Sequence, residues 1–158
     1  MEKQVSLAIM KGQISESAPI IAAFKLEVSD IDEEKMSFTI KFRAKDNELY
    51  VLIFQFENYP QHPPLLDFID EETGVHGLIK SYPKNRDSFF NRHNGQGVIC
   101  HPMNRKAYKQ MGGIHSGDWV NYEGWQQNSY TRGMNNFSAL IQAIFSRLNG
   151  DEYEGRMV

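Results

Sequence analysis

Cys100 is the only cysteine in this chain of 158 residues, and it closes the run His93-Asn94-Gly95-Gln96-Gly97-Val98-Ile99-Cys100. A single thiol cannot form an internal disulfide, so Cys100 is free to act as a nucleophile through its thiolate form. The alternative is structural, because a lone cysteine also packs well as a small apolar side chain. The glycines in the run indicate a sharp turn, or a backbone that lies close to another group. We therefore take Cys100 as the candidate nucleophile.

Three histidines lie near Cys100 in the sequence, namely His93, His101 and His115. A histidine that takes the thiol proton would create the reactive thiolate of a cysteine hydrolase. Adjacent side chains in an extended segment point to opposite faces, which argues against a direct pair of Cys100 and His101. The histidines and the cysteine would also supply four ligands for a tetrahedral zinc ion, although their spacing matches no common zinc motif. A hydrolase and a zinc protein stay open as alternatives.

A second motif precedes the cysteine run, and it reads Tyr59-Pro60-Gln61-His62-Pro63-Pro64-Leu65-Leu66-Asp67-Phe68. Prolines remove backbone donors and hold the chain extended, so the motif is typical of a rigid connection between two strands. One of its bonds to proline, with His62–Pro63 as the candidate, is expected to be cis.

The elements around these motifs are predicted from the spacing of apolar residues. Alternation of apolar and polar residues predicts strands at 24–28 and 36–43, and an apolar run predicts a third strand at 49–56. A fourth strand is predicted at 65–68. The links between these segments are short and polar, which predicts antiparallel pairing in a meander. The third strand is apolar on both faces, so we expect it in the centre of the sheet.

From Asp70 to about Met134 the chain shows little periodicity, and a stretch of that length within a compact domain is usually functional. A helical stripe follows, formed by Phe137, Leu140, Ile141, Ile144, Phe145 and Leu148. Asn135 or Asn136 is expected to cap this helix, and Gly150 to end it. Near the N-terminus, Gly12 and Pro19 are expected to interrupt any helix. We therefore expect one α+β domain over residues 1–158, with a four-stranded antiparallel meander, a core C-terminal helix and a long irregular active-site segment.

The composition is typical of a folded protein that does not bind nucleic acid. Hydrophobic residues make up 41% of the chain and charged residues 23%, with a net charge of −3 and no long basic run. No apolar stretch approaches the roughly 18 residues of a membrane span, and residues 1–10 lack the features of a secretory signal. We expect a cytoplasmic protein with no membrane contact.

The two motifs, in this order and between these elements, resemble those of the ubiquitin-conjugating enzymes. That family has a meander of four antiparallel strands and a Tyr-Pro-x-x-Pro-Pro-x-x-x-Phe segment, which residues 59–68 match position for position. The Gly-x-Ile-Cys motif of the family is matched by residues 97–100. In the family a tryptophan and a core helix follow the cysteine, and here Trp119 or Trp125 and the helix after Asn136 take these places. The resemblance spans about residues 24–148. The short N-terminal helix and the lack of the family's two C-terminal helices favour a divergent member, of the kind found in bacterial ubiquitin-like conjugation operons.

The resemblance implies a transferase that relays an acyl group. Cys100 would accept a ubiquitin-like modifier as a thioester from an activating enzyme and pass it to an amine on a target protein. No cofactor is implied, because the activating enzyme uses the ATP. Asn94 is the candidate amide donor to the oxyanion, although the family's proline between the histidine and the asparagine is absent here, and Asn91 is the substitute. As a structural alternative, the side chain of Asn94 would hydrogen-bond to the backbone of its own loop and hold that loop in place.

The remaining candidates are a histidine and several acidic residues. Besides Cys100, the cysteine run contains a second side chain that could take part in proton transfer, the imidazole of His93. Asp118, or Asp151 with its neighbours Glu152 and Glu154, would steer and desolvate the incoming lysine, with a solvated surface charge as the alternative reading. A catalytically inactive binding module of the same fold is the alternative to the enzyme as a whole.

Overall fold

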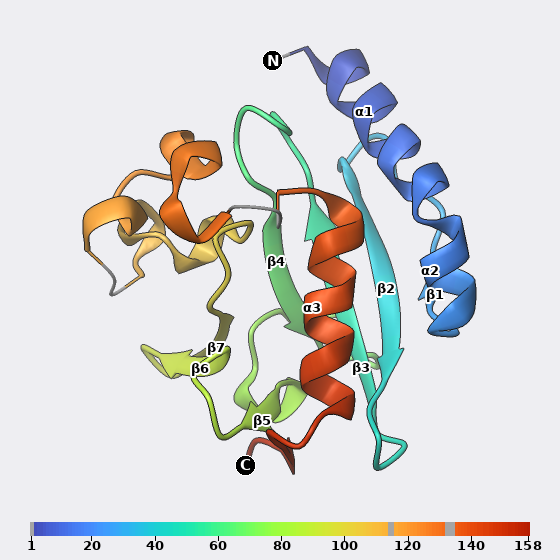
Figure 1. Cartoon of the computed structure of the whole chain (residues 1–158), viewed down its shortest axis with the longest axis vertical. Helices are drawn as coiled ribbons and strands as arrows, with labels where there is room; N and C mark the ends of the chain where they lie inside the picture. The colour runs from blue at the N-terminus through green and yellow to red at the C-terminus, as the bar shows by residue number, and fades with distance from the viewer. Residues whose placement is uncertain (1, 114–115, 132–134) are drawn as a thin grey trace.

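In the computed structural model, which describes residues 2–113, 116–131 and 135–158, four antiparallel strands form a sheet in the order β1-β2-β3-β4 (Figure 1). These strands are β1 (Glu27–Val28), β2 (Ser37–Arg43), β3 (Leu49–Gln55) and β4 (Leu65–Ile69). The predicted α+β class and antiparallel meander are confirmed, and β3 lies between β2 and β4 as its apolar faces indicated. The predicted start of the first strand is wrong. Phe24 ends a helix instead, because its ring stacks on Phe145 with 3.9 Å between ring centroids.

Helix α3 (Phe137–Asn149) lies across one face of the sheet, and it confirms the predicted C-terminal helix (Figure 1). The predicted stripe is buried except for Phe145, which packs on Phe24 at the margin. Asn136 caps the helix, because its side-chain oxygen accepts a hydrogen bond of 2.9 Å from the N–H of Ala139. The ring of Phe137 meets the rings of two strand residues edge-on, at 5.7 Å from Phe38 and 5.6 Å from Phe54. These contacts form the centre of the core.

The N-terminal region is more helical than expected, with α1 (Lys3–Glu16) and α2 (Ala18–Ala23). Gly12 does not interrupt α1, and Pro19 falls in the first turn of α2, where a missing N–H breaks no helical hydrogen bond. Gln13 fixes α1 to two other elements. Its side-chain oxygen accepts hydrogen bonds from the Tyr59 hydroxyl at 2.7 Å and from the N–H of Phe137 at 3.1 Å. One side chain thus joins α1 to the proline motif and to the start of α3.

The segment after Asp70 is less irregular than predicted. Its strands are β5 (Pro83–Asn85), β6 (Phe90–His93) and β7 (Gln96–Ile99), and the C-terminal β8 (Tyr153–Arg156) pairs with β5. Short 3₁₀ helices cover Ile79–Ser81, Arg105–Ala107, Lys109–Met111, Gly117–Trp119, Tyr122–Gln127 and Ser129–Thr131. Within the described ranges, no helix has the length and apolar character needed to pass through a membrane.

The proline motif anchors the long segment that follows Cys100. Its cis peptide bond is Tyr59–Pro60, and not His62–Pro63 as the sequence suggested. Trp125 is fully buried beside Tyr59, and its ring N–H donates a hydrogen bond of 2.9 Å to the carbonyl oxygen of Pro60. The segment therefore folds back onto the end of the sheet that carries this motif.

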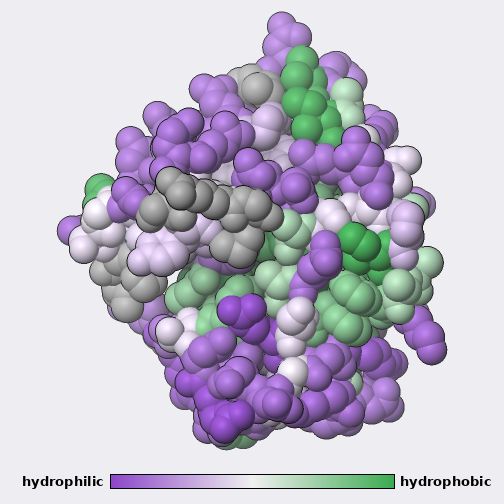
Figure 2. Space-filling view, viewed as in Figure 1, coloured by the Kyte–Doolittle hydropathy of each residue, from purple (hydrophilic) through white to green (hydrophobic). Residues whose placement is uncertain are grey.

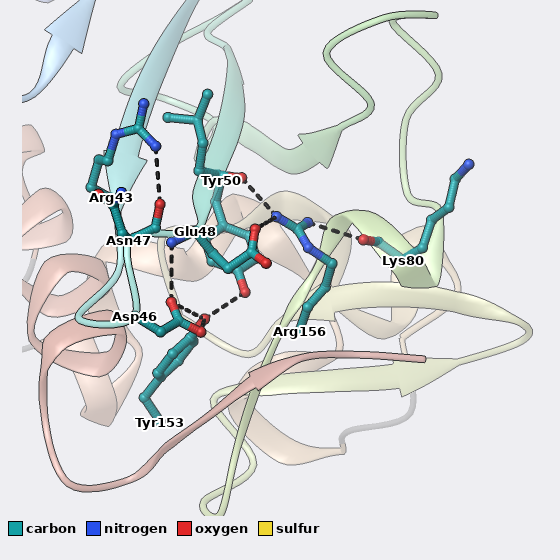
Figure 3. Close-up of polar contacts among 9 residues, drawn as sticks. Arg43, Asp46, Asn47, Glu48, Tyr50, Lys80, Tyr153 and Arg156 are labelled. Carbon is teal, nitrogen blue, oxygen red and sulfur yellow. Dashed lines mark hydrogen bonds and ion pairs between the residues drawn. The ribbon is translucent and has the colours of Figure 1, made fainter.

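A polar network ties β8 to the turn between β2 and β3 (Figure 3). The Tyr153 hydroxyl donates to the carboxylate of Asp46 at 2.9 Å. In its 2.7 Å hydrogen bond with Tyr50, the hydroxyl of Tyr50 is therefore the donor. The guanidinium of Arg156 donates to the carbonyl oxygen of Lys80 at 3.0 Å and to the carboxylate of Glu48 at 3.1 Å. Strand β8 is thereby fixed beside β5, close to the hairpin that carries the cysteine run (Figure 1).

Candidate active site around Cys100

Cys100 follows directly after β7 and is half-buried, with its thiol at a pocket of about 120 Å³. Its own N–H donates a hydrogen bond of 2.7 Å to the carbonyl oxygen of Phe89, which holds the backbone beside the start of β6. The β6–β7 hairpin forms one wall of the pocket, and residues 106, 107 and 111–113 form the other. The thiol is therefore fixed in place and open to a narrow ligand on one side.

Asn91 is the amide that contacts the thiol. It lies on β6 opposite Val98 of β7, and its side chain is hydrogen-bonded to Cys100. The side-chain oxygen of Asn91 accepts a hydrogen bond of 2.8 Å from the N–H of Arg92. The hydrogen bond between Asn91 and Cys100 lowers the pKa of the thiol, so the amide nitrogen is the group that donates to sulfur. Burial raises the pKa of the Cys100 thiol above its ordinary value of 9.0, and the hydrogen bond from Asn91 lowers the pKa by a smaller amount.

The raised pKa predicts slow alkylation of Cys100 at neutral pH. We expect the rate of reaction with iodoacetamide to keep increasing with pH up to and beyond pH 9, because only the thiolate reacts. The measurement is the loss of free thiol over time, followed by mass spectrometry at a series of pH values. A rate that levels off well below pH 8 would instead indicate the activated thiolate of a hydrolase.

Asn94 lies at the tip of the hairpin and not beside the sulfur. Asn94 and Gly95 have φ angles of 52° and 75°, the pair of positive values that defines a two-residue type I′ turn. Along β6 each residue advances about 3.3 Å, so the turn lies roughly 10 Å beyond Asn91. Asn94 reaches the rim of the pocket, but among the described residues no hydrogen bond joins it to Cys100. Its place in the turn accounts for its residue type, because asparagine tolerates positive φ.

Among the described residues no hydrogen bond joins a histidine to the thiol, and His115 lies outside them. His93 borders the same pocket from the last position of β6. His101 is only 2% exposed, and its Nδ1 accepts a hydrogen bond of 3.0 Å from the N–H of Met103. Burial, together with the nearby charge of Arg147, lowers the pKa of His101 to about 4. His101 is therefore neutral at physiological pH and does not serve as a base for Cys100.

His101 predicts a dependence of stability on pH. The unfolded chain gains a proton at this histidine near pH 6.5, whereas the folded protein does so only near pH 4, so stability falls as the pH is lowered through this window. Each pKa unit corresponds to about 1.4 kcal/mol, which gives about 3 kcal/mol in total. We expect His101→Asn, which keeps an acceptor for Met103, to remove this contribution in urea unfolding at pH 7 and pH 5. A wild-type slope retained in His101→Asn would contradict the assignment, and His76→Gln, at an exposed position, is the matched control.

No metal site is evident in the part of the chain that the structure describes, where no three His, Cys, Asp or Glu side chains are grouped to hold an ion. His115, one of the four proposed zinc ligands, lies outside the described residues. His101 turns its Nδ1 to the backbone of Met103, which leaves only its buried Nε2 without a hydrogen-bond partner.

The acidic candidates lie apart from the pocket. Asp118 is exposed in the 3₁₀ helix Gly117–Trp119, and its carbonyl oxygen accepts a hydrogen bond of 3.4 Å from Asn128. Asp151 and Glu152 follow α3 and contact Arg86, the first through its carbonyl oxygen at 2.6 Å and the second through its carboxylate at 3.6 Å. Glu154 is exposed on β8. The structure thus brings His93 and Asn94 to the pocket of Cys100, but none of these acidic residues.

An ion pair beneath the hairpin, between a buried carboxylate and a partly buried lysine, was not anticipated. The ammonium of Lys106, which borders the pocket, lies 2.8 Å from the carboxylate of Asp67 and 3.0 Å from the carbonyl oxygen of Gly97. Asp67 also accepts a hydrogen bond from the Tyr82 hydroxyl. The ring of Tyr82 packs so closely on Gly97 that a Cβ there would overlap the ring. These contacts fix β7, and with it Cys100, against β4.

Asn104 is a second positioning residue that sequence reasoning missed. It is fully buried, and its side-chain oxygen accepts hydrogen bonds from the N–H groups of Leu66 at 3.0 Å and Lys106 at 3.1 Å. Its amide nitrogen donates to the carbonyl oxygen of Ile99 at 2.8 Å. One amide therefore connects the residue before Cys100 to β4 and to the opposite wall of the pocket.

Comparison with models of known protein families gives no match, and comparison with curated protein sequences gives none either. The function of the pocket therefore has to be inferred from its own groups, which are a half-buried thiol, an amide donor, the imidazole of His93 and a nearby lysine–aspartate pair.

Proposed function

We propose that this protein is a divergent conjugating enzyme of the ubiquitin-like type. Cys100 accepts the C-terminal acyl group of a small modifier protein from an activating enzyme, holds it as a thioester and transfers it to an amine on a target protein. The observation that carries this proposal is a half-buried cysteine that lines a narrow pocket, receives an amide hydrogen bond from Asn91 and is not paired with His101. The antiparallel meander, the proline motif and the helix on the sheet add to it.

The chemistry suits a relay better than a hydrolysis. In the first step the sulfur of Cys100 attacks the thioester carbonyl of the modifier, and the thiol of the activating enzyme leaves. In the second step an amine attacks the new thioester, Cys100 leaves as a thiolate that is reprotonated, and the amine loses a proton to form the amide. His101 does not activate water beside the thioester, because its ring is buried and bonded to Met103. The raised pKa keeps the resting thiol protonated and slow to react.

Both steps pass through a tetrahedral oxyanion, and Asn91 is the donor proposed to stabilise it. Its side chain lowers the pKa of the thiol as a hydrogen-bond donor does, and its oxygen is engaged by the N–H of Arg92. A donor that is oriented before the reaction costs no reorganisation when charge develops. Asn91 therefore takes the role that the sequence had suggested for Asn94.

The test is the formation of the thioester itself. We expect the protein, incubated with ATP, a ubiquitin-like modifier that ends in glycine and the activating enzyme of that modifier, to gain the mass of one modifier, and to lose it on addition of dithiothreitol. Cys100→Ser is expected to give an adduct that resists the reductant, because an oxygen ester replaces the thioester. Cys100→Ala is expected to give none.

Two outcomes would reject the proposal. An adduct that forms equally with Cys100→Ala would place the attachment on another residue. A modifier complex that is noncovalent and unchanged by Cys100→Ala would show a passive binding module. The proposed partners are thus the activating enzyme, the modifier and the target.

A further inference from the structure

A second groove, of about 480 Å³, lies beside the Cys100 pocket along β5 and β6. Asn91 and Arg92 line both hollows, so the groove leads along β6 to the residue that contacts the thiol. Met157, which follows β8, is also part of its lining. A segment of another protein bound in this groove would therefore extend toward the sulfur.

The groove is lined by three cations, Lys84, Arg86 and Arg92. Arg92 donates a hydrogen bond of 2.7 Å to the backbone oxygen of Val158. Lys84 is exposed and takes part in no ion pair among the described residues. Arg86 faces Glu152 at 3.6 Å in a surface pair that water screens strongly. Figure 2 shows a hydrophilic surface over this end of the molecule, where β5, β6 and the C-terminal strand lie in Figure 1.

The acidic side chain in the lining does not offset these charges. Asp87 is paired with Arg147 at 3.2 Å, and Arg147 also lies over the ring of Phe89 at 4.5 Å. The groove thus retains a positive character although the chain as a whole carries a net charge of −3. An anionic ligand fits this local charge.

We propose that this groove binds an extended acidic segment of the target protein and so delivers a nearby lysine to Cys100. The inference rests on the proposed function, and it adds the class of target protein that receives the modifier. A single-stranded nucleic acid is disfavoured because such ligands need exposed aromatic rings for stacking, and Phe90, the aromatic residue of the lining, is 3% exposed.

The first experiment measures binding without chemistry, in the Cys100→Ser protein. The probe is a fluorescein-labelled peptide of alternating aspartate and glycine, compared with the same peptide carrying asparagine and with a labelled oligothymidine of equal charge. We expect saturable binding of the aspartate peptide that weakens with added salt. We expect Lys84→Glu with Arg86→Gln to weaken it at least tenfold, and the matched pair Lys35→Glu with Arg43→Gln to leave it unchanged. Equal binding of the asparagine peptide, preference for the oligonucleotide, or no effect of Lys84→Glu with Arg86→Gln would overturn the proposal.

The second experiment separates this proposal from the proposed function. Protein charged with modifier is discharged onto two lysine peptides, one flanked by aspartate and one by asparagine. We expect faster discharge onto the acidic peptide, with a ratio that falls to one in Lys84→Glu with Arg86→Gln. If the thioester forms and both peptides react alike, the groove proposal is wrong while the proposed function stands. If no thioester forms, the proposed function is wrong, and the binding experiment still decides what the groove recognises.

Discussion

We expect Asn91→Ala to slow the transfer of the modifier from Cys100 to lysine by about two to three orders of magnitude. The loss of one preorganised donor to an oxyanion typically has an effect of this size, about 3–4 kcal/mol in the activation free energy. Asn91 is suited to that role because its amide nitrogen contacts the sulfur and its oxygen is held by the N–H of Arg92. The measurement is a single-turnover assay, in which the charged protein is mixed with excess lysine and the decay of the thioester is followed.

Asn94→Ala is the matched control, because it removes the same amide from the turn of the same hairpin. Its φ of 52° makes alanine unfavourable there, so we expect a loss of stability of about 1 kcal/mol but an unchanged transfer rate for the folded protein. Asn91→Asp retains the shape without the donor and is expected to be as slow as Asn91→Ala. A normal rate for Asn91→Ala together with a slow Asn94→Ala would return the role to the turn residue.

Lys106→Met is expected to destabilise the folded protein by about 3–5 kcal/mol. The substitution keeps the apolar part of the side chain but leaves the carboxylate of Asp67, whose side chain is 5% exposed, without its cation. The hydrogen bond to the carbonyl oxygen of Gly97 is lost as well, so β7 is also released from β4. The free energy of unfolding in urea, measured by circular dichroism, tests this expectation.

A double variant identifies the cause of the effect. Lys106→Met combined with Asp67→Asn removes the buried charge while an oxygen still accepts from Tyr82, so most of the lost stability is expected to return. Lys41→Met breaks an exposed pair with Glu71 at 3.2 Å, and we expect it to cost less than about 1 kcal/mol. A Lys106→Met protein as stable as Lys41→Met would show that the pair contributes nothing.

The meander and the core helix were predictable because their signals are local. Alternation over 36–43 and the helical stripe from Phe137 to Leu148 depend on which faces are buried, and both segments bury those faces. The first strand was placed too early because Phe24 continues the alternation of the strand, whereas its partner Phe145 is distant in sequence. Strand β8 was missed for a similar reason, since its pairing with β5 and its contacts with Asp46 are long-range.

The site was predictable in part. The placement of Asn91 was available from the sequence, because Asn94-Gly95 is the preferred pair for a two-residue hairpin turn. Such a turn pairs His93 with Gln96, and therefore Asn91 with Val98, next to the thiol. Asp67 also gave a signal, as a charged residue within an apolar strand needs a buried partner. The identity of that partner, Lys106, depends on how the segment after Cys100 folds back onto β4, and the sequence alone does not determine this.

The turn at Asn94 and Gly95 joins two paired strands, and this determines where the hairpin tolerates variation in sequence and length. With the amide donor on a paired strand, its distance to Cys100 is set by the ladder and not by the loop. Residues inserted at the tip would lengthen the hairpin without displacing the reacting groups. The tip is therefore a natural place for lineage-specific insertions, and a suitable site for grafting a recognition peptide onto the protein.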